Sequence, residues 1–184
     1  MSEYKLSTEN INEWVSSLKA GDRVLLSGVI YTARDAAHKR IVSLLSEGKD
    51  LPFDIKDSVV YFAGPTPAKE GLAIGSIGPT TSSRMDRFSP MMISLGQKAM
   101  IGKGNRSQEV IDAMKENVAV YFAAVGGAGA LYSGCIKSCE VVGFEDLGCE
   151  SVKRLVVEDF PLLVAIDSQG NSLYDERGAL EKVL

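Results

Sequence analysis

The stretch RVLLSGVIYTARDAAHKRIVSLL, residues 23–45, decides the fold class of this 184-residue chain. Residues 23–31 are rich in aliphatic and β-branched side chains, which predicts a β-strand. Residues 35–45 place apolar side chains three and four positions apart, which predicts an amphipathic helix. A strand that leads directly into a helix indicates an α/β fold.

The rest of the chain repeats this mixture. Glycine and proline separate short apolar runs without forming a linker, so we expect a single domain over residues 1–184. We expect a helix at 107–117 with Ser107 as its cap, and an interrupted helix at 84–95 with Pro90 in its interior. The other predicted elements are a helix at 11–18, strands at 58–63, 98–101, 118–125, 135–144, 153–157 and 161–166, a long loop at 64–81, and glycine-rich or polar turns at 126–129 and 167–171.

Composition and charge exclude several classes of protein. A hydrophobic content of 45% with 24% charged residues is typical of a folded domain and argues against disorder. The net charge of −4, without a strongly basic stripe, argues against nucleic acid binding. Residues 34–106 hold 11 bases and 7 acids, which permits a small anionic ligand. Neither a membrane helix nor a secretion signal is evident, so we expect a cytoplasmic protein.

The cysteines do not predict a metal site. Cys135, Cys139 and Cys149 are odd in number and match no zinc spacing, and the one histidine, His38, is distant in sequence. We therefore expect free thiols and no metal ligated by this chain.

Three turns combine small polar residues with a cation before a predicted helix. They are TARD at 32–35, GPTTSSR at 78–84 and GKGNRS at 102–107. Helix N-termini attract anions, and arginine offers a planar fork that matches a carboxylate. The three turns could converge on a ligand with more than one carboxylate. Alternatively, each is a well-capped helix start with a solvated cation.

These segments resemble a known family. TARDAAHKR (32–40), FAGPTPAKEGLAIGSIGPTTSSRMD (62–86) and KGNRS (103–107) are similar to the β subunit, or C-terminal domain, of class I iron-sulfur hydro-lyases, which include class I fumarate hydratase and L-tartrate dehydratase. The resemblance implies a swivelling β/β/α domain, with a mixed sheet and flanking helices, that closes over a [4Fe-4S] cluster held by another domain. Because this chain begins at Met1 with only the second domain, we expect a hetero-oligomer with a separate α subunit that carries the cluster. The cysteines of this chain would then not be cluster ligands.

The resemblance also implies roles for individual residues. Arg34 and Arg84 are similar to arginines that bind the substrate carboxylates, Lys103 to a binding lysine, and Thr80 to the proposed catalytic base, with Arg34 also placed in the catalytic set. The alternative for Thr80 is an N-terminal cap of the helix near Arg84. His38, one helical turn after Arg34, could orient that arginine, meet the partner, or be structural.

Two aspartates lie near these arginines in the sequence. Asp35 and Asp86 could orient the neighbouring arginines or form simple surface ion pairs.

The sequence thus predicts the β subunit of a fumarate hydratase that interconverts fumarate and L-malate, a hydro-lyase active only with its α subunit. One alternative is the β subunit of an L-tartrate dehydratase, which converts tartrate to oxaloacetate. The other is a noncatalytic anion-binding module of the same fold.

Overall fold

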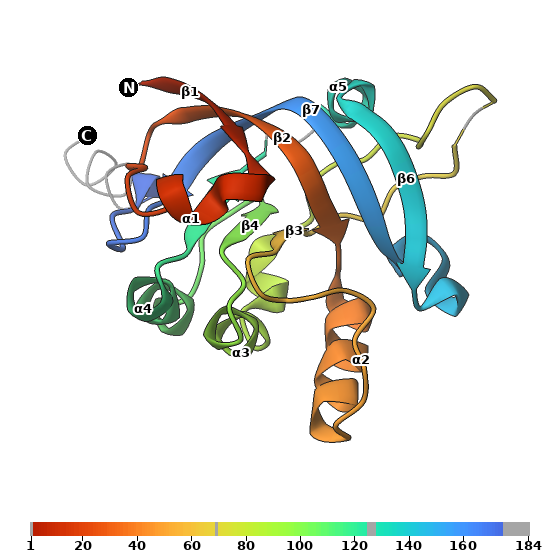
Figure 1. The fold of residues 1–184 in the computed structure, drawn as a ribbon, viewed down its shortest axis with the longest axis horizontal. Coiled ribbons are helices and arrows are strands. Elements are labelled where there is room, and N and C mark those ends of the chain that lie inside the picture. The colour runs from red at the N-terminus through yellow and green to blue at the C-terminus, as the bar shows by residue number, and fades with distance from the viewer. Residues whose placement is uncertain (1, 69, 125–127, 175–184) are drawn as a thin grey trace, which may run out of the picture.

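The computed structural model describes residues 2–68, 70–124 and 128–174, and it contains a mixed sheet with flanking helices (Figure 1). The expected α/β class is therefore confirmed. The strands of the described residues are β1 (Glu3–Ser7), β2 (Arg23–Thr32), β3 (Val59–Tyr61), β4 (Ala99–Gly102), β5 (Val120–Ala123), β6 (Ile136–Gly143) and β7 (Val152–Ile166). The helices are α1 (Ile11–Trp14), α2 (Asp35–Ser46), α3 (Ser89–Ser94), α4 (Gln108–Asn117) and α5 (Gly129–Gly134), with short 3-10 helices η1 (Thr8–Asn10), η2 (Ser82–Met85) and η3 (Glu145–Glu150).

The sheet closes on itself. Its order is β1-β2-β3-β4-β5-β7-β6, and strands β1 to β5 pair in parallel. β7 runs antiparallel to β5 and also pairs with β2. Strands β2, β3, β4, β5 and β7 therefore form a closed, barrel-like sheet, which β1 and β6 extend at its two edges.

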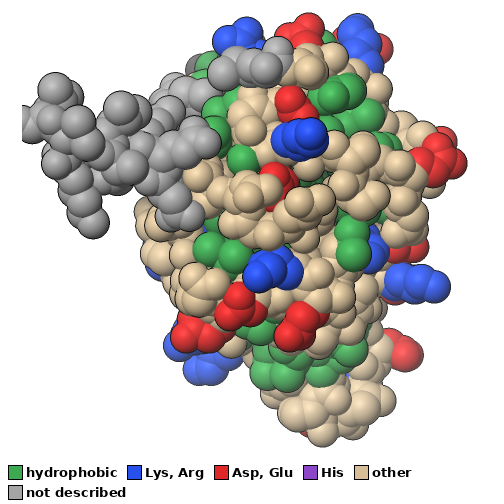
Figure 2. Space-filling view, turned by 90° about the vertical axis from the view of Figure 1, so that its left-hand side faces the viewer, with side chains coloured by type: hydrophobic (Ala, Val, Ile, Leu, Met, Phe, Trp, Pro, Cys, Tyr) green, Lys and Arg blue, Asp and Glu red, His purple; other side chains and the backbone are tan. Residues whose placement is uncertain are grey.

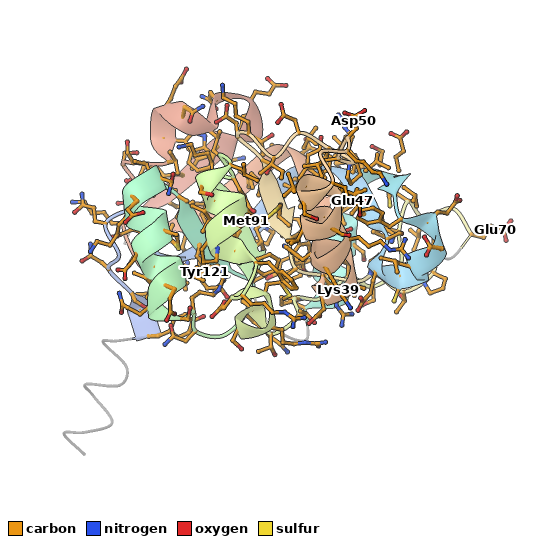
Figure 3. All side chains as sticks on the ribbon, turned by 90° about the horizontal axis from the view of Figure 1, so that it is seen from below. Lys39, Glu47, Asp50, Glu70, Met91 and Tyr121 are labelled. Atoms are coloured by element: carbon orange, nitrogen blue, oxygen red, sulfur yellow. The ribbon has the colours of Figure 1, made fainter. Side chains whose placement is uncertain are left out.

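Alternation along the central strands builds two cores. In β3, Val59 and Tyr61 belong to one buried cluster, whereas Val60 belongs to the other. The second cluster also contains apolar side chains from α2, α3 and α4, which lie side by side over the outer face of the sheet (Figure 3). Both faces of these strands are thus buried, which explains their continuous apolar sequences.

Some elements differ from the sequence predictions. The predicted strands at 153–157 and 161–166 are one strand, β7, which continues through Asp159 at a left-handed φ of 48° and a shift in register opposite β2. Pro90 stands in the first turn of α3, where its missing N–H costs nothing, and not in a helix interior. The first helix is shorter than expected, strand β1 and helix α5 were not predicted, and residues 125–127 of the predicted strand and turn lie outside the described residues.

Charge is mixed over the surface that Figure 2 shows, where basic and acidic side chains are interspersed. This face therefore presents no extended field of one sign. Among the described residues, no helix has the length and apolar character that a bilayer crossing requires.

Candidate active site

The three cation-bearing turns meet at one edge of the sheet. Arg34 follows the carboxyl end of β2 and Lys103 follows that of β4, and these strands flank β3 on its two sides. Carboxyl ends of parallel strands are the usual place for ligands in α/β proteins. The segment that contains Thr80 crosses this edge, since the Thr80 N–H donates to the carbonyl of Phe62 at 2.7 Å. The Ser82 N–H donates to the carbonyl of Lys103 at 2.9 Å, so the segments of Thr80 and Lys103 lie side by side.

Asp35 brings Arg84 to the start of α2. Arg84 Nε donates to Asp35 Oδ1 at 3.1 Å, and Arg84 Nη2 lies 3.0 Å from Oδ2. This two-point pair places the second arginine beside the residue that follows Arg34. The Arg84 side chain is half exposed, so much of its guanidinium faces solvent.

Glu150 holds the other arginine. Its Oε1 atom lies 3.2 Å from Arg34 Nη2, and its Oε2 atom accepts the Ala36 N–H at 3.3 Å. The N-terminus of α2, where the sequence suggested a ligand anion, therefore already holds a carboxylate of this chain. Sequence reasoning did not single out Glu150, because no local signal links it to Arg34.

Asp86, directly after η2, and Arg106, just before α4, join these two segments below the surface. Asp86 Oδ1 accepts from Arg106 Nε and Oδ2 accepts from the Ser107 N–H, both at 2.7 Å. Arg106 is fully buried and also donates to Ser89 Oγ at 2.6 Å. The sequence left open whether Asp35 and Asp86 orient the neighbouring arginines or form simple surface pairs. Asp35 pairs with the half-exposed Arg84, and Asp86 pairs with the buried Arg106, so neither contacts the arginine beside it in the sequence. Ser107 occupies the N-cap position of α4 as expected, but no capping bond from its side chain is made.

Lys103 and Thr80 present side chains that the rest of the described chain leaves free. The Lys103 side chain is exposed and forms no ion pair with a described residue. Thr80 is partly buried, and its hydroxyl makes no hydrogen bond within the described part of the chain. Thr81, not Thr80, is the N-cap of η2, so the interpretation of Thr80 as a helix cap is wrong.

His38 is a core residue of this region. It is 1% exposed, its Nδ1 lies 2.9 Å from the carbonyl oxygen of Arg34, and its ring packs against Phe62 and Phe88. Burial lowers its pKa to about 4, so it is neutral at pH 7. The carbonyl can only accept, so Nδ1 carries the proton. His38 is therefore too buried to meet a partner.

The three cysteines are free thiols, as expected, and Cys149 directly precedes Glu150 in η3. Cys135 and Cys139 are partly buried, and burial raises the pKa of both thiols, while Cys149 is exposed. No group of three or more His, Cys, Asp or Glu side chains in the described residues could hold a metal. The described residues therefore do not offer the ligand set of an iron-sulfur cluster.

Comparisons with known proteins agree with the resemblance seen in the sequence. The family model described as Fumarase C-terminus matches residues 1–177. Fumarate hydratase 2 of Leishmania major is 37% identical over 95% of this chain, and the aerobic class I fumarate hydratase of Escherichia coli K12 is 40% identical over 88%. This chain spans only 31% and 30% of those two proteins. A Methanocaldococcus jannaschii protein named "Putative L(+)-tartrate dehydratase subunit beta" is 44% identical over 88% of this chain and 86% of its own length. The chain belongs to the Fumarase C-terminus family.

Proposed function

We propose that this chain is the β subunit of a two-subunit class I fumarate hydratase that interconverts fumarate and L-malate. The observation that carries the proposal is that the segments bearing Arg34, Arg84 and Lys103 meet at the carboxyl ends of β2 and β4. Full-length fumarate hydratases among the relatives are about three times as long as this chain. The Methanocaldococcus jannaschii relative, of which this chain covers 86%, is named "Putative L(+)-tartrate dehydratase subunit beta". On that ground we propose that a separate α subunit supplies the rest of the enzyme, including a [4Fe-4S] cluster, in a cytoplasmic hetero-oligomer.

The proposed substrate is a dicarboxylate, because its two anionic ends match the several cationic side chains of the site. Arg34 and Arg84 present guanidinium groups that match carboxylates, and Lys103 adds a compact positive charge. Removal of a proton next to a carboxylate places negative charge on that carboxylate, which fixed cations stabilise. In this proposal the three side chains bind the substrate and support the charge that develops on it.

We propose that Thr80 transfers the proton at the carbon next to the substrate carboxylate. Its hydroxyl is free of hydrogen bonds to the described residues, and its backbone is held by Phe62. Threonine is a weak base, so nearby positive charge must favour its deprotonated form. Arg84, four positions later in the same segment, is the nearest cation in sequence.

L-tartrate dehydratase is a second candidate, supported by one observation. The Methanocaldococcus jannaschii relative is of similar length to this chain, and its name assigns it to tartrate. Tartrate is also a dicarboxylate, so the same cations would bind it.

The test is to reconstitute the purified chain with an α subunit, iron and sulfide under anaerobic conditions. Hydration of fumarate and dehydration of L-tartrate are then measured with the assembled complex and with the chain alone. We expect turnover only in the complex, with fumarate preferred. Robust turnover by the metal-free chain alone would contradict the proposal, and a preference for tartrate would support the second candidate.

A further inference from the structure

We propose that Glu150 is a positioning residue, which fixes the Arg34 guanidinium in the orientation that binds a substrate carboxylate. This inference rests on the proposed function. Glu150 is the last residue of η3, and its carboxylate spans Arg34 and the first turn of α2. Both side chains of the pair are about four-fifths buried, with exposed fractions of 21% for Arg34 and 22% for Glu150.

The contacts of Arg34 leave some of its N–H donors without a hydrogen bond to a described residue. Glu150 lies against Nη2, whereas the buried Nε makes no hydrogen bond to a described residue. On the other side, a Cβ added at Gly64 would lie 3.0 Å from Arg34 Nη1 and 3.3 Å from its Cδ. The side chain is therefore enclosed between Glu150 and the backbone of Gly64. Because arginine has five N–H donors, a ligand carboxylate can bind while Glu150 keeps its contact.

The turn that carries Glu150 is held by a lysine from β7. The amine of Lys153 lies 2.7 Å from Ser151 Oγ and 3.2 to 3.3 Å from the carbonyl oxygens of Gly148, Cys149 and Ser151. These oxygens belong to the residues on both sides of Glu150. The lysine is only 9% exposed, so the turn folds around a buried amine. Such a support fixes the carboxylate before any substrate arrives, which is how positioning residues lower the cost of binding.

A second ion pair, between α2 and η3, supplies a matched control. Arg40 of α2 pairs with Asp146 of η3, and both of these side chains are more exposed than Arg34 and Glu150. If η3 served only to anchor α2, loss of either pair would have a similar effect. Of these two acidic residues, Glu150 pairs with Arg34 and Asp146 does not, so loss of Glu150 and not of Asp146 should change substrate binding.

The first experiment compares Glu150→Gln with Asp146→Asn in the reconstituted complex. Glutamine keeps the shape of Glu150 but removes its charge. We expect Glu150→Gln to raise KM about tenfold with a smaller change in kcat, the order of effect of losing one charge-assisted contact. Asp146→Asn should keep KM within about twofold of the unmodified enzyme, as is usual for an exposed pair. A lower KM in Glu150→Gln, or equal losses in both variants, would overturn the inference.

The second experiment does not depend on activity. The full chain is treated with phenylglyoxal, and modification of Arg34 is followed by peptide mass spectrometry, while thermal melts confirm that each variant is folded. We expect faster modification of Arg34 in Glu150→Gln and an unchanged rate in Asp146→Asn. An unchanged rate in both would overturn the inference. If the unmodified complex does not hydrate fumarate, the proposed function fails, and the labelling rates still decide the role of Glu150.

Discussion

Replacing Asp86 by alanine should lower the free energy of unfolding by about 3 to 5 kcal/mol, the usual cost of removing one partner of a buried ion pair. The Arg106 side chain is 0% exposed, so its charge would remain inside the protein without a carboxylate. Its other contacts are a hydroxyl, a thioether and two aromatic rings, none of which carries a negative charge. The Ser107 N–H at the start of α4 would also lose its acceptor, which adds about 1 kcal/mol.

The measurement is urea unfolding of the full chain followed by circular dichroism, with linear extrapolation to water. Asp35→Ala is the matched control, because its partner Arg84 is half exposed and such pairs contribute about 0 to 1 kcal/mol. The double variant Asp86→Ala with Arg106→Met should recover much of the lost stability, since it removes the unpaired buried charge. A loss below about 1 kcal/mol in Asp86→Ala, or no recovery in the double variant, would refute the reasoning.

Three further predictions concern the candidate site. Arg84→Ala or Lys103→Ala should lower kcat/KM of the reconstituted complex by roughly tenfold to a few hundredfold, whereas the exposed Arg87→Ala, whose guanidinium stacks 4.5 Å from the Phe88 ring centre, should not. Thr80→Ala should lower kcat by about 10² to 10⁴-fold while Thr80→Ser retains much of it; because Thr80 is not a helix cap, a normal kcat in Thr80→Ala would show that another group moves the proton. The pKa of His38 is about 4 in the folded chain against 6.5 ordinarily, so the unfolded chain takes up its proton first. The contribution of neutral His38 to the free energy of unfolding should be fully present above pH 6.5. It should fall by about 3 kcal/mol toward pH 4, at roughly 1.4 kcal/mol per pH unit. Denaturant titrations of His38→Leu should show a shallower decline over this window, and an equal slope would contradict the assignment.

The fold was largely predictable where local signals and burial agree. Strands β3, β4 and β5 are apolar on both faces because one face lines the closed sheet and the other lies under helices. Helices α2 and α4 carry apolar stripes that match the second core. Strand β1 escaped prediction because its first three residues are exposed and its pairing with β2 depends on tertiary structure. β7 seemed to be two strands because Pro161 and Asp159 resemble a turn, yet a local irregularity lets the strand continue.

The sequence indicated which turns would lie together, but it did not indicate which side chains would pair with one another. The polar turns after β2 and β4 signalled anion-binding chemistry at one sheet edge. The partners of the arginines were not predictable, because residues adjacent in sequence at a helix start point in different directions, and partners arrive from other segments. Arg84 reaches Asp35, and Arg34 is held by Glu150, contacts that only the folded sheet creates.

The closure of the sheet by β7 has a consequence for how the chain folds. β7 pairs with β2 from Arg23 opposite Leu163 to Thr32 opposite Lys153. The first long strand therefore cannot complete its pairing until the last strand has been made. Contacts so distant in sequence slow folding, and until they form, the open edges of β2 and β5 are exposed to other chains. During synthesis the early segments of the site can assemble only loosely. Because β7 begins directly after the turn that carries Glu150, and Lys153 stands opposite Thr32 of β2, this turn takes its place beside Arg34 only when the last strand has paired with β2.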